Sequence, residues 1–175
     1  MAGDATDTDC DREHDYRRVD VEDLPDAPNP TRRKKEVDEA VGATEFGFNL
    51  LVADPGERLP WGYHRHPDHE ELFYVLSGTV RFETADGTVE VGEGEAFFVP
   101  RGAPNRGEAV GDEPARVVAA GAPKDADRAV VEEECPECGA ATDREYEVVE
   151  ADGERAYRLT CAGCGAEVDV LTAGP

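Results

Sequence analysis

Residues 72–99 read LFYVLSGTVRFETADGTVEVGEGEAFFV, and this stretch decides the fold. It begins with a continuous apolar run, residues 72–76, which ends at a Ser-Gly pair. Residues 79–83 then alternate apolar and polar side chains, as a half-buried strand does. The Asp-Gly pair at 86–87 is a strong two-residue hairpin signal, and residues 88–91 read as the returning strand.

Further short strands are expected on both sides of this stretch. Residues 46–52 and 116–119 have the apolar, β-branched or aromatic character of strands, and residues 96–99 form another short apolar segment. No long amphipathic helix is evident. Many short strands at close, regular spacing are typical of a sandwich or a small barrel, so the sequence predicts a mainly β fold.

Three potential metal ligands precede the apolar run. His64 and His66 are two residues apart, which puts both side chains on one face of a strand. Glu71 follows a short bend that contains Pro67 and is expected to return to the same face. Two imidazoles and a carboxylate leave coordination positions open and suit Fe, Mn, Ni or Zn, so the pattern indicates a divalent metal site.

Residues 45–120 resemble the cupin family. The resemblance rests on the two histidines and the glutamate, on LFYVLSG at 72–78 and on GEAFFVPRG at 94–102. It implies a small double-stranded β-helix, or jelly-roll, barrel with a metal inside and His64, His66 and Glu71 as ligands. It also implies a homodimer.

The chain departs from the family pattern at Asn105. By the resemblance, a third histidine should stand three residues after Gly102, where this chain has Asn105. Its amide oxygen can bind a cation weakly, or the position can be left to water, or the site can be empty with hydrogen-bonded histidines. We expect a metal with Asn105 completing or bordering the site, and we expect the nearby His69 to be exposed on a turn.

A second metal motif lies near the C-terminus. The CxxC pairs Cys135/Cys138 and Cys161/Cys164 are separated by the 22 residues from 139 to 160, and each is followed by glycine. Two matched CxxC units at this distance predict a zinc ribbon. Four thiolates close a tetrahedral site, so this Zn²⁺ is expected to be structural.

The composition is strongly acidic. The chain has 175 residues, with 41 acidic against 18 basic, and a formal net charge of −23. Acidic residues are spread along the whole chain, which indicates a halophilic protein, because salt screens the self-repulsion of such a surface. In this respect the chain resembles a haloarchaeal cupin. The balance makes nucleic acid an unlikely partner, and the polar N-terminus and lack of long apolar runs indicate a cytoplasmic protein with no membrane contact.

The expected organisation has four parts. Residues 1–40 form a flexible acidic arm that includes Cys10 and His14, residues 41–123 form the barrel, residues 124–134 form a linker, and residues 135–175 form the zinc ribbon. The ribbon has an excess of six negative charges, which argues for contact with a protein partner or for capping of the barrel.

The leading hypothesis is a metal-binding cupin that binds or acts on a small oxygen-bearing or carboxylate molecule. An enzyme of this kind would be a dioxygenase, an isomerase or a decarboxylase, and the sequence identifies no catalytic base. The alternative is a non-enzymatic module that has lost the barrel metal, binds a small molecule or nothing, and docks a partner through its ribbon.

Overall fold

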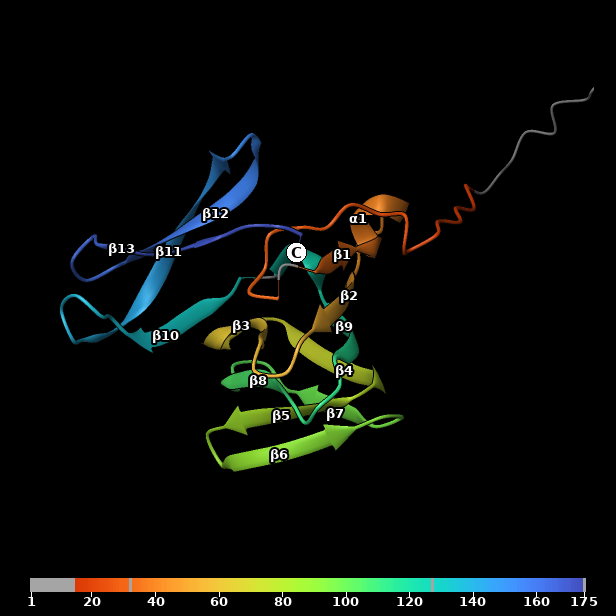
Figure 1. The fold of residues 1–175 in the computed structure, drawn as a ribbon, viewed down its shortest axis with the longest axis horizontal. Helices are drawn as coiled ribbons and strands as arrows, with labels where there is room; N and C mark the ends of the chain where they lie inside the picture. Colours follow the sequence, from red (N-terminus) through yellow and green to blue (C-terminus); the bar gives the residue numbers. More distant parts are fainter. Residues whose placement is uncertain (1–14, 32, 127, 175) are drawn as a thin grey trace, which may run out of the picture.

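The computed structural model describes residues 15–31, 33–126 and 128–174 (Figure 1). The first part of the expected arm, with Cys10 and His14, lies outside these described residues. The described chain is almost entirely β, so the prediction of a mainly β fold is confirmed. Neither described helix, α1 or the turn η1, is long and apolar enough to cross a membrane.

The first sheet joins five of the described strands in the order β1–β2–β9–β4–β7, and all their pairings are antiparallel. Their bounds are β1 (Lys34–Glu36), β2 (Gly47–Ala53), β9 (Ala115–Ala122), β4 (Glu70–Ser77) and β7 (Ala96–Val99). The short helix α1 (Val37–Val41) follows β1.

The second sheet joins eight described strands in the order β13–β12–β11–β10–β3–β8–β5–β6. Four of them face the first sheet: β3 (Arg58–Arg65), β8 (Asn105–Val110), β5 (Thr79–Thr84) and β6 (Gly87–Gly92). The other four are β10 (Val130–Glu134), β11 (Ala141–Ala151), β12 (Glu154–Cys161) and β13 (Glu167–Leu171), which extend to one side of the barrel in Figure 1. A 3-10 turn, η1 (Lys124–Ala126), follows β9.

The hydrophobic core lies between the two sheets. Phe73 and Val75 of β4 are fully buried, whereas their neighbours Leu72 and Tyr74 point outward. The ring of Phe82 on β5 lies 5.0 Å from that of Phe73 and also stacks on Phe97. Burying one such phenylalanine contributes about 2–3 kcal/mol to folding. The side chains of β4 thus alternate between the core and the outer face, although residues 72–76 are all apolar.

The predicted hairpin is confirmed in β5 and β6. Their pairing runs from Thr79 opposite Gly92 to Thr84 opposite Gly87. Gly87 has φ +125°, a conformation that L side chains rarely adopt, and the Thr84 hydroxyl donates a 2.9 Å hydrogen bond to the Gly87 carbonyl. The turn therefore needs glycine at this position.

Strand β10 connects the barrel to the C-terminal strands. Val131 pairs with His64 of β3, and Glu132 pairs with Asp143 of β11. Residues 124–134 were expected to be a linker, and the second half of that range is a paired strand. Likewise, the range 1–40, expected to be a flexible arm, contains β1 near its end.

A carboxylate of β10 braces β3 beside the expected metal ligands. Glu133 Oε1 accepts hydrogen bonds of 3.2 Å from the Tyr63 amide and from the Arg58 guanidinium. A Cβ at Gly62 would lie only 2.3 Å from the same oxygen. Glu133 therefore contacts β3 where its register against β8 is irregular, between Leu59 and His64.

Candidate metal centre

Three potential ligands converge inside the barrel. His64 is the last buried residue of β3, His66 follows the strand, and Glu71 belongs to β4. One ligand atom from each lies within 4.8 Å of the others. Glu71 Oε1 is 3.6 Å from His66 Nε2, and Glu71 Oε2 is 3.9 Å from His64 Nε2. The sequence therefore predicted correctly which three side chains come together.

The tautomer of His64 suits metal binding. Its Nδ1 lies 2.9 Å from the carbonyl oxygen of Gly62, which can only accept a hydrogen bond. Nδ1 therefore carries the proton of the neutral ring, and the lone pair is on Nε2, which faces Glu71. A hydrogen bond of this kind fixes the orientation of a ligating imidazole.

Asn105 borders the same cluster. It is the register partner of His64 across β3 and β8, and its side chain is 1% exposed. Among the described residues, neither its amide nitrogen nor its amide oxygen has a hydrogen-bond partner. Leaving such a buried group unsatisfied costs about 1–3 kcal/mol, and a water or a ligand at this amide would recover that free energy.

The donor set fits a divalent cation. It offers two imidazole nitrogens and a carboxylate, all buried or nearly so, with an amide at its border. His64, His66 and Glu71 would hold the ion and leave open positions, and the Asn105 oxygen would border it. The fit allows Fe, Mn, Ni or Zn without selecting among them.

The four C-terminal cysteines also form one cluster. Cys135 and Cys161 are buried, and Cys138 and Cys164 are exposed. The Sγ atoms of Cys135 and Cys164 are 3.8 Å apart, and those of Cys138 and Cys161 are 3.9 Å apart. Sulfurs placed tetrahedrally at about 2.3 Å from zinc are about 3.8 Å from one another, so the spacing fits one Zn²⁺.

The two CxxC turns have the same backbone geometry. The Gly139 amide donates to the Cys135 carbonyl and the Gly165 amide donates to the Cys161 carbonyl, both at 2.8 Å. Gly139 and Gly165 have φ +69° and +74°, the left-handed conformation that favours glycine. Each glycine therefore eases the turn that follows its CxxC pair.

The thiols of the second turn differ in pKa. The Thr142 hydroxyl lies 3.0 Å from Cys161 Sγ, stabilises the thiolate and lowers the pKa of Cys161 to about 6. At Cys164 the Ala166 amide favours the thiolate, but desolvation and the neighbouring thiols outweigh it and raise the pKa to about 12. Holding four thiolates side by side therefore requires a cation.

Comparison with known proteins identifies the barrel. Residues 49–121 match the family model described as Cupin domain. This segment runs from β2 to β9 and contains His64, His66, Glu71 and Asn105. Residues 49–121 are a cupin domain.

Relatives of the cupin domain have names from polyketide chemistry. The chain is 33% identical over 106 residues to polyketide synthase CurC of Streptomyces cyaneus, covering 58% of this chain and 66% of that protein. It is 34% identical over 79 residues to tetracenomycin polyketide synthase protein TcmJ of Streptomyces glaucescens, covering 45% of this chain and 52% of that one. The structure is similar to that of the polyketide cyclase RemF from Streptomyces resistomycificus, with a TM-score of 0.54 and 26% identity over 65% of this chain and 83% of that chain. The chain thus spans between about half and two thirds of the two curated relatives.

The cupin domain contains a buried histidine that the sequence placed wrongly. His69, expected to be exposed, is 4% exposed, and its Nδ1 donates a 3.0 Å hydrogen bond to the Pro123 carbonyl. Its ring lies 5.1 Å from that of His66. The bend after Pro67 turns His69 inward, where the end of β9 supplies an acceptor.

A small cavity adjoins the ligands of the cupin domain. Its volume is about 60 Å³, and His66, His69 and Glu71 form part of its wall. Lys34 of β1 and Trp61 of β3 complete the side toward the C-terminal strands. Sequence reasoning missed Lys34 at this site because the pairing of β1 with β2 is not visible in local patterns.

Proposed function

We propose that the cupin domain holds a divalent metal through His64, His66 and Glu71 and binds a small oxygen-bearing molecule beside it. The observation that carries this proposal is the convergence of three buried ligand atoms within 4.8 Å. The unsatisfied amide of Asn105 supports it, because a metal-bound water or a substrate oxygen would supply the missing partner.

The bound metal would act as a Lewis acid and orient a substrate through its oxygens. The chain itself does the positioning. The Gly62 carbonyl fixes the His64 ring, and β10 fixes β3 behind it. Asn105 offers both a donor and an acceptor, so it can orient a hydroxyl or a carbonyl group.

The substrate class follows from the relatives and the site together. Proteins named for polyketide synthesis and cyclisation support an oxygen-rich carbon skeleton as the ligand. The open positions of a two-histidine, one-carboxylate site suit such oxygens. An activity of the isomerase, decarboxylase or dioxygenase type is consistent with this site.

The four cysteines are proposed to bind one structural zinc. Their spacing supports this role. A module of about forty residues has too small a hydrophobic core to fold without a structural metal ion. We also propose that the protein works in a salt-rich cytoplasm, which the net charge of −23 supports.

A homodimer is proposed through the outer face of the five-stranded sheet. Leu72 pairs with Phe98 across β4 and β7, and both side chains are exposed, as are Tyr74 and Leu76. A contiguous apolar patch on so acidic a chain favours a second copy of the chain as the partner. The side chains of the patch are uncharged, so the same patch on the two copies can pack together without repulsion.

Metal content per chain tests the barrel site. The wild type should contain two metals per chain, and the His64→Ala/His66→Ala variant should contain one. Arg65→Ala is the matched control, since Arg65 lies between the two histidines but pairs outward with Glu132 at 3.0 Å. One zinc per chain in all three proteins, with no uptake of added Fe, Mn or Ni, would overturn the proposal and favour a non-enzymatic module.

A further inference from the structure

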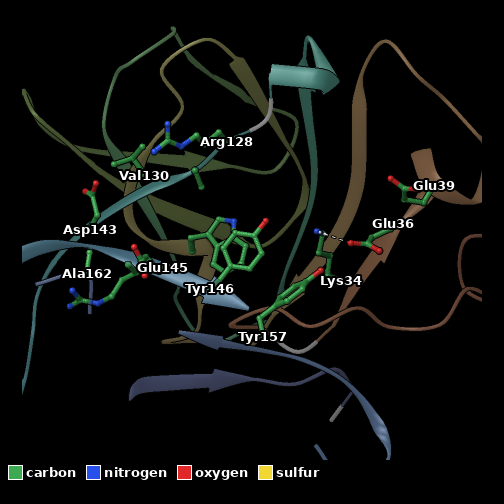
Figure 2. Close-up of a pocket in the computed structure, with 13 residues that line it drawn as sticks. Lys34, Glu36, Glu39, Arg128, Val130, Asp143, Glu145, Tyr146, Tyr157 and Ala162 are labelled. Atoms are coloured by element: carbon green, nitrogen blue, oxygen red, sulfur yellow. Dashed lines mark hydrogen bonds and ion pairs between the residues drawn. The ribbon is translucent and has the colours of Figure 1, made fainter. Parts of the chain in front are cut away.

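A large cavity lies between the cupin domain and the C-terminal strands (Figure 2). Its volume is about 990 Å³, and three distant parts of the chain line it. Lys34 and Glu36 come from β1, Trp61 from β3, and Tyr146 and Tyr157 from β11 and β12. No single domain forms this cavity.

The large cavity is adjacent to the small cavity beside the metal ligands. Lys34 and Trp61 line both it and the 60 Å³ cavity that contains His66, His69 and Glu71. The two cavities therefore share a wall, and a molecule in the large one contacts residues that also line the small one.

Size decides which cavity holds the body of a substrate. A volume of 60 Å³ holds about two water molecules at about 30 Å³ each. Sites for small organic molecules usually measure about 300–1,000 Å³. Only the larger cavity is in this range, so the cavity inside the barrel has room for a metal and a small functional group but not for a ring system.

The wall of the large cavity is rich in aromatic rings. The Trp61 ring lies 6.2 Å from that of Tyr157, which lies 5.7 Å from that of Tyr146. Tyr146 is 63% exposed although it lies on a concave surface. Three neighbouring rings, one of them largely uncovered, provide faces and edges on which a flat ligand can stack.

The charges on the wall are nearly balanced. Glu36 is paired with Lys34 at 3.1 Å and with Arg155 at 3.0 Å. The lining has three further acidic residues, Glu39, Asp143 and Glu145, and two further basic residues, Arg128 and Arg144. In Figure 2, Tyr146 and Tyr157 lie between Asp143 and Glu145 on one side and the Lys34–Glu36 pair on the other. Such a wall does not suit a polyanion and suits a largely uncharged molecule.

We propose that this cavity binds the ring system of the substrate, a planar aromatic molecule of two or more rings with a hydroxyl or carboxylate at one end. The rings stack against Trp61, Tyr146 and Tyr157, and the oxygen-bearing end passes Lys34 toward His66 and Glu71. This inference rests on the proposed function for the oxygen-bearing end. It makes the C-terminal module part of the substrate site.

Trp61 allows a direct test, because it is the one tryptophan of the chain. Titration of the metal-loaded protein with 3-hydroxy-2-naphthoic acid should quench Trp61 fluorescence, and calorimetry should give the same Kd. Cyclohexanecarboxylic acid, which has a carboxylate but no aromatic ring, should bind at least about fivefold more weakly. Equal binding of the two acids, or no binding of the naphthoic acid, would overturn the inference.

Substitution at Tyr157 locates the binding. Tyr157→Ala should weaken naphthoic acid binding about fivefold, because one aromatic contact contributes about that much. Tyr157→Phe keeps the ring and should bind as the wild type does. Tyr16→Ala removes a tyrosine that is 87% exposed and does not line the cavity, and it serves as the matched control. Unchanged zinc content and circular dichroism would show that the variants are folded, and wild-type binding by folded Tyr157→Ala would reject the cavity.

The His64→Ala/His66→Ala variant separates this inference from the proposed function. Tyr157-dependent binding in a wild-type protein whose metal content equals that of the His64→Ala/His66→Ala variant would support the cavity and reject the metal centre. A metal-loaded barrel whose binding of the naphthoic acid ignores Tyr157 would support the metal centre and reject the cavity.

Discussion

The ring of His69 lies directly over Gly121, so closely that a Cβ at residue 121 would come within 1.9 Å of His69 Nε2. Gly121 is on β9 and pairs with Glu71 of β4, so the approach occurs beside the candidate metal ligands. No side chain other than hydrogen fits at residue 121 while His69 keeps this position. The glycine and the buried histidine therefore depend on each other.

Gly121→Ala should displace His69 or the end of β9. We expect a loss of about 1–3 kcal/mol in the free energy of unfolding, as overpacking usually causes. Because His69 contacts His66, metal affinity of the barrel should fall about tenfold. Denaturant unfolding and metal titration measure the two effects. Gly47→Ala is the matched control, since Gly47 pairs with Gly121 but its Cβ would meet only one atom, at 3.9 Å. Equal behaviour of both variants would contradict this account.

Asn105→Leu should separate stability from metal binding. It removes two buried polar atoms that the described chain leaves unsatisfied, so the metal-free protein should become more stable by about 1 kcal/mol. The increase in stability that metal binding causes should be smaller in this variant than in the wild type. Thermal unfolding with and without metal measures both. Asn29→Leu is the contrast, because Asn29 accepts hydrogen bonds from Thr31 and its loss should destabilise the protein. Destabilisation by Asn105→Leu in the absence of metal would count against the role given to Asn105.

Thr142→Val should change the pH dependence of Cys161. The Thr142 hydroxyl holds the pKa of Cys161 at about 6, so in zinc-free protein the thiolate forms as pH rises through about 6. Because the pKa of Cys161 is lower in the folded protein than in the unfolded chain, its thiolate stabilises the folded state at pH values above the ordinary thiol pKa. This stabilisation is lost as the pH falls through about 6. In the variant, the Cys161 thiolate, measured by its ultraviolet absorbance in zinc-free protein, should form at a higher pH, nearer the ordinary value of 9. Thr160→Val, next to Cys161 on β12, should leave the titration profile unchanged. A profile unchanged by Thr142→Val would mean that the hydroxyl has no such effect.

Phe98→Glu should disrupt the proposed homodimer. The charge would lie at the β7 edge of the apolar patch, beside Leu72. Light scattering should give a dimer mass for the wild type and a monomer mass for the variant. Val89→Glu introduces the same charge at an exposed apolar position on β6 of the other sheet and should remain a dimer. A monomeric wild type at high salt would dismiss the dimer.

Salt should stabilise the whole protein. With a net charge of −23, self-repulsion is strong in dilute buffer. The screening length falls from about 10 Å at 0.1 M salt to about 3 Å at 1 M. We expect Tm to rise by at least about 5 °C between these concentrations of KCl, which corresponds to about 2 kcal/mol. A nonionic solute at equal osmolality controls for effects of water activity. A Tm that is independent of KCl would argue against the halophilic interpretation.

Local patterns were sufficient to predict most strands of the barrel and both ligand clusters, but they did not predict β8 at residues 105–110. Alternation in residues 79–83 and the Asp-Gly turn are short-range signals, and they define β5 and β6. Strand geometry predicted a shared face for His64 and His66, and their side chains do meet, although β3 ends at Arg65 and His66 follows it. The paired CxxC units carry their own turn chemistry. These features need no knowledge of distant contacts.

Long-range contacts account for what the sequence did not reveal. His69 is buried because the Pro123 carbonyl, fifty-four residues away, accepts its proton. Residues 130–134 look like a charged linker, and they form a strand because β3 and β11 offer edges on both sides. The aromatic cavity exists only because this strand brings Tyr157 against Trp61.

The pairing of β10 with β3 determines how a truncated chain would behave. Cutting after residue 123 would remove the strand that covers the backbone of His64 and Arg65. The truncated barrel would then present an open β edge, which is a template for pairing with other chains. The isolated barrel should therefore aggregate, and in the full chain the C-terminal strands prevent this aggregation by covering the edge of β3.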